Sequence, residues 1–161
     1  MIPCIIESPF AGCVPLHVAY ANAAVRTCLR EGFTPYASHL MLTRALDDND
    51  PDEREFGIRA GIVMRDALLA SRTDAHALFF VDLGWSRGMR ASRESLPTMP
   101  RLQTWQISEE EWLRVGLDAC VNARFRRCVR EAAQGSDNRE GLLAARELWL
   151  ARYDPFVEAV Q

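Results

Sequence analysis

An apolar run that ends in a carboxylate constrains the fold of this chain most. Residues 75–82 (AHALFFVD) have the pattern of a buried strand and lead directly into the glycine turn and serine of residues 83–89 (LGWSRGM). A second strand of this kind is predicted at residues 2–6 and ends in the polar loop of residues 7–12 (ESPFAG). Two such strands suggest an open parallel sheet, in which ligands bind beyond the carboxyl ends of the strands.

The rest of the chain alternates helical and extended patterns. Helices are predicted over residues 16–31, from about 51 to 71, from Ser86 to before Pro97, over 108–133 and over 139–153, with short strands at 33–37 and 101–107. Ser108 and Glu111 have the spacing of a capping box. This order predicts a three-layer α/β domain over residues 1–107 and a helical extension over 108–161 packed on the same domain.

Composition excludes several functions. All 19 basic residues are arginine, which rules out a Schiff-base lysine and a phosphate-loop lysine. A net charge of −3 gives no reason to expect binding to a nucleic-acid polymer. Five cysteines without a C-x-x-C pair predict reduced thiols and no metal site. Because no signal peptide or membrane-length apolar run is found, we expect a cytoplasmic protein that does not contact membranes.

Three carboxylates are candidate catalytic groups. Asp82 ends the most apolar strand, and Glu7 stands where the first strand opens into its loop, so both are expected at one crevice. Glu94 lies about two turns into the helix that Ser86 starts. Two carboxylates at an apolar pocket are the groups that glycosidic chemistry requires. The structural alternatives are a loop-capping role for Asp82, a turn acceptor for Glu7 and a solvated surface position for Glu94.

Other polar and aromatic residues of the same loops are candidate substrate contacts. Helix-end amides near Ser86 suit a phosphate or sugar hydroxyls, His39 is suited to proton transfer or to packing, and aromatic rings suit stacking on a base or core packing. The predicted substrate-binding residues are Ser8, Phe10, Gly12, His39, Gly84, Trp85, Ser86, Gly88 and Met89.

Taken together, five spaced segments resemble a known family. They are IIESPFAG, HVAYANAAVRTCLREG, PYASHL, LDDNDPDEREFGIRAG and VDLGWSRGM, within residues 2–94. In this order they resemble the small nucleoside 2-deoxyribosyltransferase-like proteins, in particular an uncharacterised subgroup common in bacteriophages and mobile elements. The resemblance implies a flavodoxin-like (Rossmannoid) sheet, no cofactor, and cleavage or exchange of the N-glycosidic bond of a nucleoside or nucleotide.

In the enzymes of that family, a glutamate near the start of the helix after the D-x-G-type loop attacks the anomeric carbon. Here the nearest match is Glu94, which stands later than that spacing, and Ser92 occupies the expected position. The tyrosine of the family's first-strand motif is also missing, whereas Glu7 adds a carboxylate there.

Two functions of different classes follow from this comparison. The leading hypothesis is an N-glycosidic-bond enzyme, a hydrolase or 2-deoxyribosyltransferase, that uses Glu7, Asp82 and Glu94. The alternative is a catalytically inactive protein that binds or sequesters a nucleotide, because Ser92 replaces the expected nucleophile. Apolar residues in the last helices further predict a homo-oligomer.

Overall fold

The computed structural model describes residues 1–11, 14–96 and 101–117, which form nine helices and strands. In chain order these are β1 (Ile2–Glu7), α1 (Val14–Arg30), β2 (Phe33–Tyr36), α2 (Ser38–Leu42), α3 (Pro51–Ser71), β3 (His76–Phe80), α4 (Arg87–Glu94), β4 (Leu102–Trp105) and α5 (Glu109–Leu117). The helices predicted beyond residue 117 lie outside the described residues.

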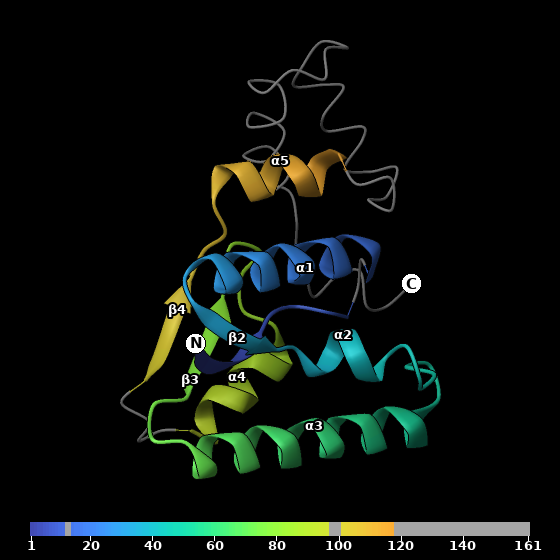
Figure 1. Ribbon diagram of the computed structural model, residues 1–161. Helices are drawn as coiled ribbons and strands as arrows, with labels where there is room; N and C mark the ends of the chain where they lie inside the picture. Colours follow the sequence, from blue (N-terminus) through green and yellow to red (C-terminus); the bar gives the residue numbers. More distant parts are fainter. Residues whose placement is uncertain (12–13, 97–100, 118–161) are drawn as a thin grey trace.

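The strands form a parallel sheet in the order β2-β1-β3-β4. The chain moves outward from β1 to β2, then returns across β1 to add β3 and β4 on the other side. Right-handed crossovers therefore place α1 on one face of the sheet and the helices between β2 and β4 on the other. Figure 1 shows α1 and α5 above the sheet and α3 and α4 below it. The predicted three-layer, flavodoxin-like α/β class is confirmed.

The sheet buries a large hydrophobic cluster on the face covered by α1 and a smaller one on the opposite face. On the α1 face, Ile6, Leu78 and Phe80 pack with Tyr20 of α1 and Trp112 of α5 in the larger cluster. On the opposite face a smaller cluster is formed by Ala77, Phe79 and Met89, with Val81, Trp85, Leu96 and Leu102 packed against it. Side chains alternate along each strand, so neighbouring residues contribute to opposite clusters.

Local sequence explains where the elements begin and end. Pro35 lacks a backbone N–H donor. It is tolerated because β2 is an edge strand, which pairs with only one neighbouring strand. The Ser86 hydroxyl accepts a hydrogen bond from the amide of Met89 and caps α4, as predicted. Asp50 caps α3 in the same way, and Pro51 occupies its first turn. Within the described residues no helix is long and apolar enough to cross a membrane.

The predicted capping box at the start of α5 is only half right. The Ser108 hydroxyl accepts a hydrogen bond from the amide of Glu111 at 3.3 Å, as such a box requires. The Glu111 carboxylate, however, is buried against α1, where it lies 2.7 Å from Arg26 Nε and 2.7 Å from Arg30 Nη1. A buried carboxylate gains more from two guanidinium groups than from one backbone amide. The side chain therefore joins α5 to α1.

Candidate functional site

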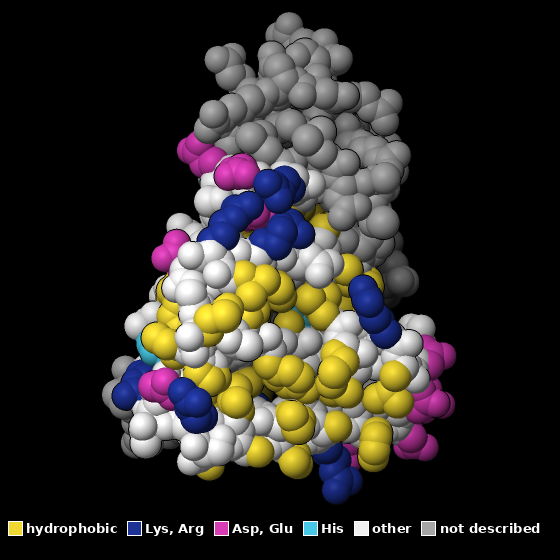
Figure 2. All heavy atoms as spheres, viewed as in Figure 1, with side chains coloured by type: hydrophobic (Ala, Val, Ile, Leu, Met, Phe, Trp, Pro, Cys, Tyr) yellow, Lys and Arg dark blue, Asp and Glu magenta, His cyan; other side chains and the backbone are white. Residues whose placement is uncertain are grey.

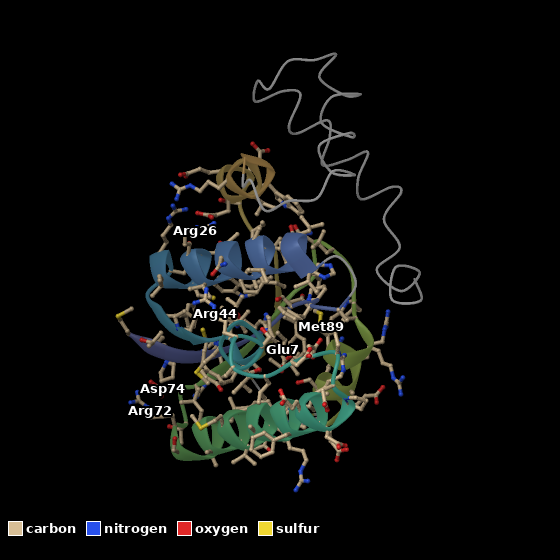
Figure 3. The ribbon with its side chains drawn as sticks, turned by 90° about the vertical axis from the view of Figure 1, so that its right-hand side faces the viewer. Glu7, Arg26, Arg44, Arg72, Asp74 and Met89 are labelled. Atoms are coloured by element: carbon tan, nitrogen blue, oxygen red, sulfur yellow. The ribbon has the colours of Figure 1, made fainter. Side chains whose placement is uncertain are left out.

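Glu7 lies at the point where the strand order reverses. It is the last residue of β1 and pairs with Phe79 of β3, the strand on the other side of the reversal. Figure 3 looks onto the edge of the sheet where the strands end and shows Glu7 near its centre, among α2, α3 and α4. Ligands of open α/β sheets bind at such a position, because the loops on the two sides diverge there.

A chain of hydrogen bonds links Glu7 to two helices. The Ser92 hydroxyl of α4 donates to Glu7 Oε1 at 2.7 Å and accepts from Arg65 Nη1 of α3 at 2.9 Å. Arg65 Nε donates in turn to Asp66 Oδ1 at 2.8 Å. Arg65 is only 6% exposed. Its buried charge is tolerated because Ser92 and Asp66 both accept hydrogen bonds from its guanidinium group. Ser92 therefore connects the carboxylate of β1 to a buried cation.

Opposing effects act on the acidity of Glu7. Burial raises the pKa of its carboxyl group above the ordinary value of 4.5, whereas the Ser92 hydrogen bond and the charge of Arg65 lower it. Burial is the larger effect, because it removes water from the charged form. The pKa of Glu7 is thus higher than that of a surface glutamate, while Ser92 and Arg65 favour its ionised form.

Ser8, the residue that follows Glu7 in the sequence, is paired with a histidine. Ser8 Oγ and His39 Nε2 share a hydrogen bond of 2.9 Å, which joins the end of β1 to α2. Burial and the nearby charge of His17 lower the pKa of His39 to about 4, so its imidazole is neutral at physiological pH. The Phe10 ring packs edge-on to the His39 ring at 5.7 Å, and His17 Nδ1 donates to the Phe10 carbonyl. The two histidines thereby hold the loop that follows β1.

Asp82 lies on the opposite side of the sheet from Glu7. Its carboxylate accepts hydrogen bonds from the Tyr20 hydroxyl at 2.6 Å, the Ile107 amide at 3.1 Å and the Trp112 indole at 3.3 Å. The Asp82 amide donates back to the Tyr20 hydroxyl at 3.1 Å. Only 8% exposed, Asp82 fastens α1 and α5 to the end of β3. The structure does not bring it together with Glu7.

Glu94 is also separated from Glu7. It is the last residue of α4 and is exposed. Ser92 stands two residues earlier, which is about 200° around the helix, and this places it toward Glu7. The structure therefore pairs Glu7 with Ser92 and not with Glu94.

The remaining predicted contacts surround the start of α4. Trp85 stacks on Phe79 at 5.3 Å between ring centroids, and the Arg93 guanidinium lies 5.3 Å from the Trp85 ring. Met89 is buried in the smaller core cluster, and Gly84 has a φ of +82°, which favours glycine. Gly88 is exposed in the first turn of α4. Gly12 lies outside the described residues.

Sequence reasoning missed two residues of this site. Arg65 is one, although a lone arginine within the apolar pattern of α3 (IVMRDALL) was a signal of a specific partner. Tyr36 is the other: its hydroxyl is buried without a hydrogen-bond partner in the described structure. Tyr36 pairs with Ile5 of β1, so strand alternation puts its side chain on the same face of the sheet as Glu7. Burial raises the pKa of Tyr36, so the hydroxyl keeps its proton and is a donor.

Fold and site define a class: an α/β protein with flavodoxin-like strand order and a partly buried carboxyl group at its strand switch point. Residues 3–98 match the family model of a domain of unknown function, DUF7768. Because the match covers more than half of the 161 residues, the chain belongs to this family. No curated protein and no solved structure matches the chain. In the parts of the chain that the structure describes, no cluster of three or more potential metal ligands is found.

Proposed function

We propose that this protein cleaves or transfers the N-glycosidic bond of a nucleoside or nucleotide, with Glu7 as the reacting carboxylate. The observation that carries the proposal is the 2.7 Å contact between Glu7 Oε1 and Ser92 Oγ. The family resemblance expects the nucleophilic glutamate at position 92. In this chain α4 has a serine at that position, and the Glu7 carboxylate extends from β1 to contact it. Glu7 can therefore supply the carboxylate that the helix lacks.

The chemistry needs a carboxylate at the sugar. Breaking a glycosidic bond passes through an oxocarbenium-like sugar, which an ionised carboxylate stabilises or traps covalently. In the covalent route a Glu7 oxygen forms a bond to the anomeric carbon while the bond from that carbon to the base breaks, and the base takes the electron pair and a proton. Water or a second base then displaces Glu7 and restores its carboxylate. Ser92 holds the Glu7 carboxylate, and Arg65 acts on it through Ser92.

The leaving base needs a hydrogen bond or a proton as its bond to the sugar breaks. We assign this role to the neutral His39 imidazole, which shares a hydrogen bond with Ser8, or to the Tyr36 hydroxyl, which is buried without a partner in the described structure. Asp82 does not fit this task, because three donors from the α1 face already surround its carboxylate. Its proposed role is to hold α1 and α5 in place.

The experiment is a panel of nucleosides, deoxynucleosides and their 5′-phosphates incubated with the purified protein, with release of free base measured by chromatography. The wild-type protein and Glu94→Gln should release base at similar rates. Glu7→Gln should lose at least about 100-fold in rate while keeping its circular dichroism spectrum. If no substrate yields base and calorimetry shows tight binding of an intact nucleotide, the protein is the nucleotide-binding alternative and the enzymatic proposal fails.

The same proposal places the protein in the cytoplasm, where nucleosides and nucleotides are available to it. The proposed ligand is a small molecule and not a nucleic-acid polymer, since the net charge of −3 gives no electrostatic attraction to a polyanion.

A further inference from the structure

Helix α3 packs on the rest of the molecule with small and charged residues and exposes large apolar ones. Two glycines of α3 lie against α2 and the turn that follows it: a Cβ atom added at Gly61 would lie 3.2 Å from Ser38 Cβ of α2, and one at Gly57 would lie 3.1 Å from Leu46 Cδ1. Arg65 is the buried residue of this helix. Phe56 and Val63, by contrast, are 65% and 66% exposed. This arrangement reverses the usual one, in which a surface helix buries its large apolar side chains.

Several apolar residues of α3 are exposed, among them Ile58, Ile62 and Met64. One row of apolar residues runs along the side of the helix opposite Arg65, at intervals of four, three, four and three residues. This row, termed here the α3 seam, consists of Phe56, Ala60, Val63, Ala67 and Ala70. Figure 2 shows hydrophobic side chains gathered over α2 and α3. Such spacing is typical of a helix that packs lengthwise against another helix.

We propose that the α3 seam pairs with the α3 seam of a second copy of this chain, antiparallel, about a twofold axis at Val63. Residues related by this axis have position numbers that sum to about 126. Phe56 then lies against the partner's Ala70, which combines a large with a small side chain, and Ala60 lies against the partner's Ala67. Three alanines in five positions permit a close approach of the two backbones.

Charges beside the seam favour the same pairing. Arg59 and Asp66 lie on one flank of the seam, seven residues apart and nearly symmetric about Val63. In an antiparallel pair Arg59 faces the partner's Asp66, and Asp66 faces the partner's Arg59. Arg59 is exposed and has no ion pair within the described residues, whereas Asp66 uses its Oδ1 for Arg65 and leaves Oδ2. The two copies would thus form two equivalent salt bridges. This inference is independent of the proposed function.

Sedimentation equilibrium of the full chain tests the proposal. The wild-type protein should be a dimer in a concentration-dependent equilibrium. Val63→Arg places two like charges at the twofold axis and should weaken dimerisation by about 100-fold or more. Leu29→Arg on α1, in the layer across the sheet, is the matched control, because Leu29 is 47% exposed and lies outside the seam. This variant should remain a dimer.

Charge exchange provides a second measurement that keeps the seam apolar. Arg59→Asp should weaken the dimer, and adding Asp66→Arg should restore it, since the two salt bridges re-form with reversed signs. A wild-type monomer at all concentrations overturns the proposal. A dimer that Val63→Arg leaves intact also overturns it, because a different surface would then join the copies.

Discussion

The hydroxyl of Ser92 donates a hydrogen bond to the carboxylate of Glu7 across 85 positions of sequence. This bond joins the end of β1 to α4, and through Arg65 it also involves α3. Three segments that are distant in sequence therefore meet at one carboxyl group. Substitutions at either end of the bond should reveal how much of the behaviour of the site depends on it.

Removing the Ser92 hydroxyl should make Glu7 a weaker acid. Ser92→Ala abolishes the hydrogen bond that lowers the pKa of Glu7 and cuts the link to Arg65. We expect the Glu7 pKa to rise and the protein to lose about 1–2 kcal/mol of unfolding free energy. The carboxyl carbon resonance of Glu7, followed by NMR from pH 3 to 9, measures the first effect. Ser95→Ala, which removes an exposed hydroxyl of the same region, should leave the titration unchanged.

Replacing Glu7 by glutamine should stabilise the protein at neutral pH. The pKa of Glu7 is higher in the folded state than in the unfolded state, where it is near 4.5. Stability is therefore full below pH 4.5 and falls as the pH rises to the folded pKa, because the unfolded chain releases its proton first. Urea unfolding at pH 4 and pH 8 should show Glu7→Gln gaining on the wild type at the higher pH. Equal differences at the two values would contradict the burial of this charge.

His39 should make the protein sensitive to mild acid. Its folded pKa of about 4 lies below the ordinary value of 6.5, so the unfolded chain takes up a proton first as the pH falls. The stability that depends on neutral His39 is complete above pH 6.5 and is lost between pH 6.5 and about 4, at a cost on the order of 3 kcal/mol. Urea unfolding of His39→Asn should show a shallower loss over this range. An imidazole resonance of His39 that titrates near 6.5 would refute the prediction.

The Asp82 cluster should be a major source of stability. Tyr20→Phe removes a 2.6 Å hydrogen bond to a buried carboxylate and should cost about 1.5–3 kcal/mol in urea unfolding. Asp82→Asn should be comparably harmful, and the double variant should cost less than the sum, because both changes remove the same bond. Tyr36→Phe is the matched control: its hydroxyl has no partner in the described structure, so its loss should leave stability unchanged or slightly higher.

Much of the fold could be predicted because strong local signals mark its elements. The apolar run that ends in Asp82, the proline at the start of α3 and the serine that caps α4 each act within a few residues. The predicted end of α3 near residue 71 also agrees with the structure. Parallel pairing also followed, because strands alternated with helices.

The site was harder to predict, because it depends on which face each strand end presents. Glu7 and Asp82 both follow apolar strands, and sequence places both at the carboxyl edge. Register decides the rest: Glu7 lies beside Phe79 on one face, whereas Asp82 follows the alternation of Leu78 and Phe80 toward the other. Periodicity within one strand does not give the register between two. The same limit explains why Ser92 and Arg65 were not predicted to meet Glu7.

The hydrogen bonds of Asp82 also bear on where this protein can be divided. Two donors to its carboxylate, Ile107 and Trp112, lie beyond residue 98, where the family match ends, and so does β4, which pairs with β3. A chain truncated at that boundary would expose the flank of β3 and remove two hydrogen-bond donors from a buried anion. The sequence signature of the family is therefore shorter than the smallest piece of this polypeptide expected to fold independently.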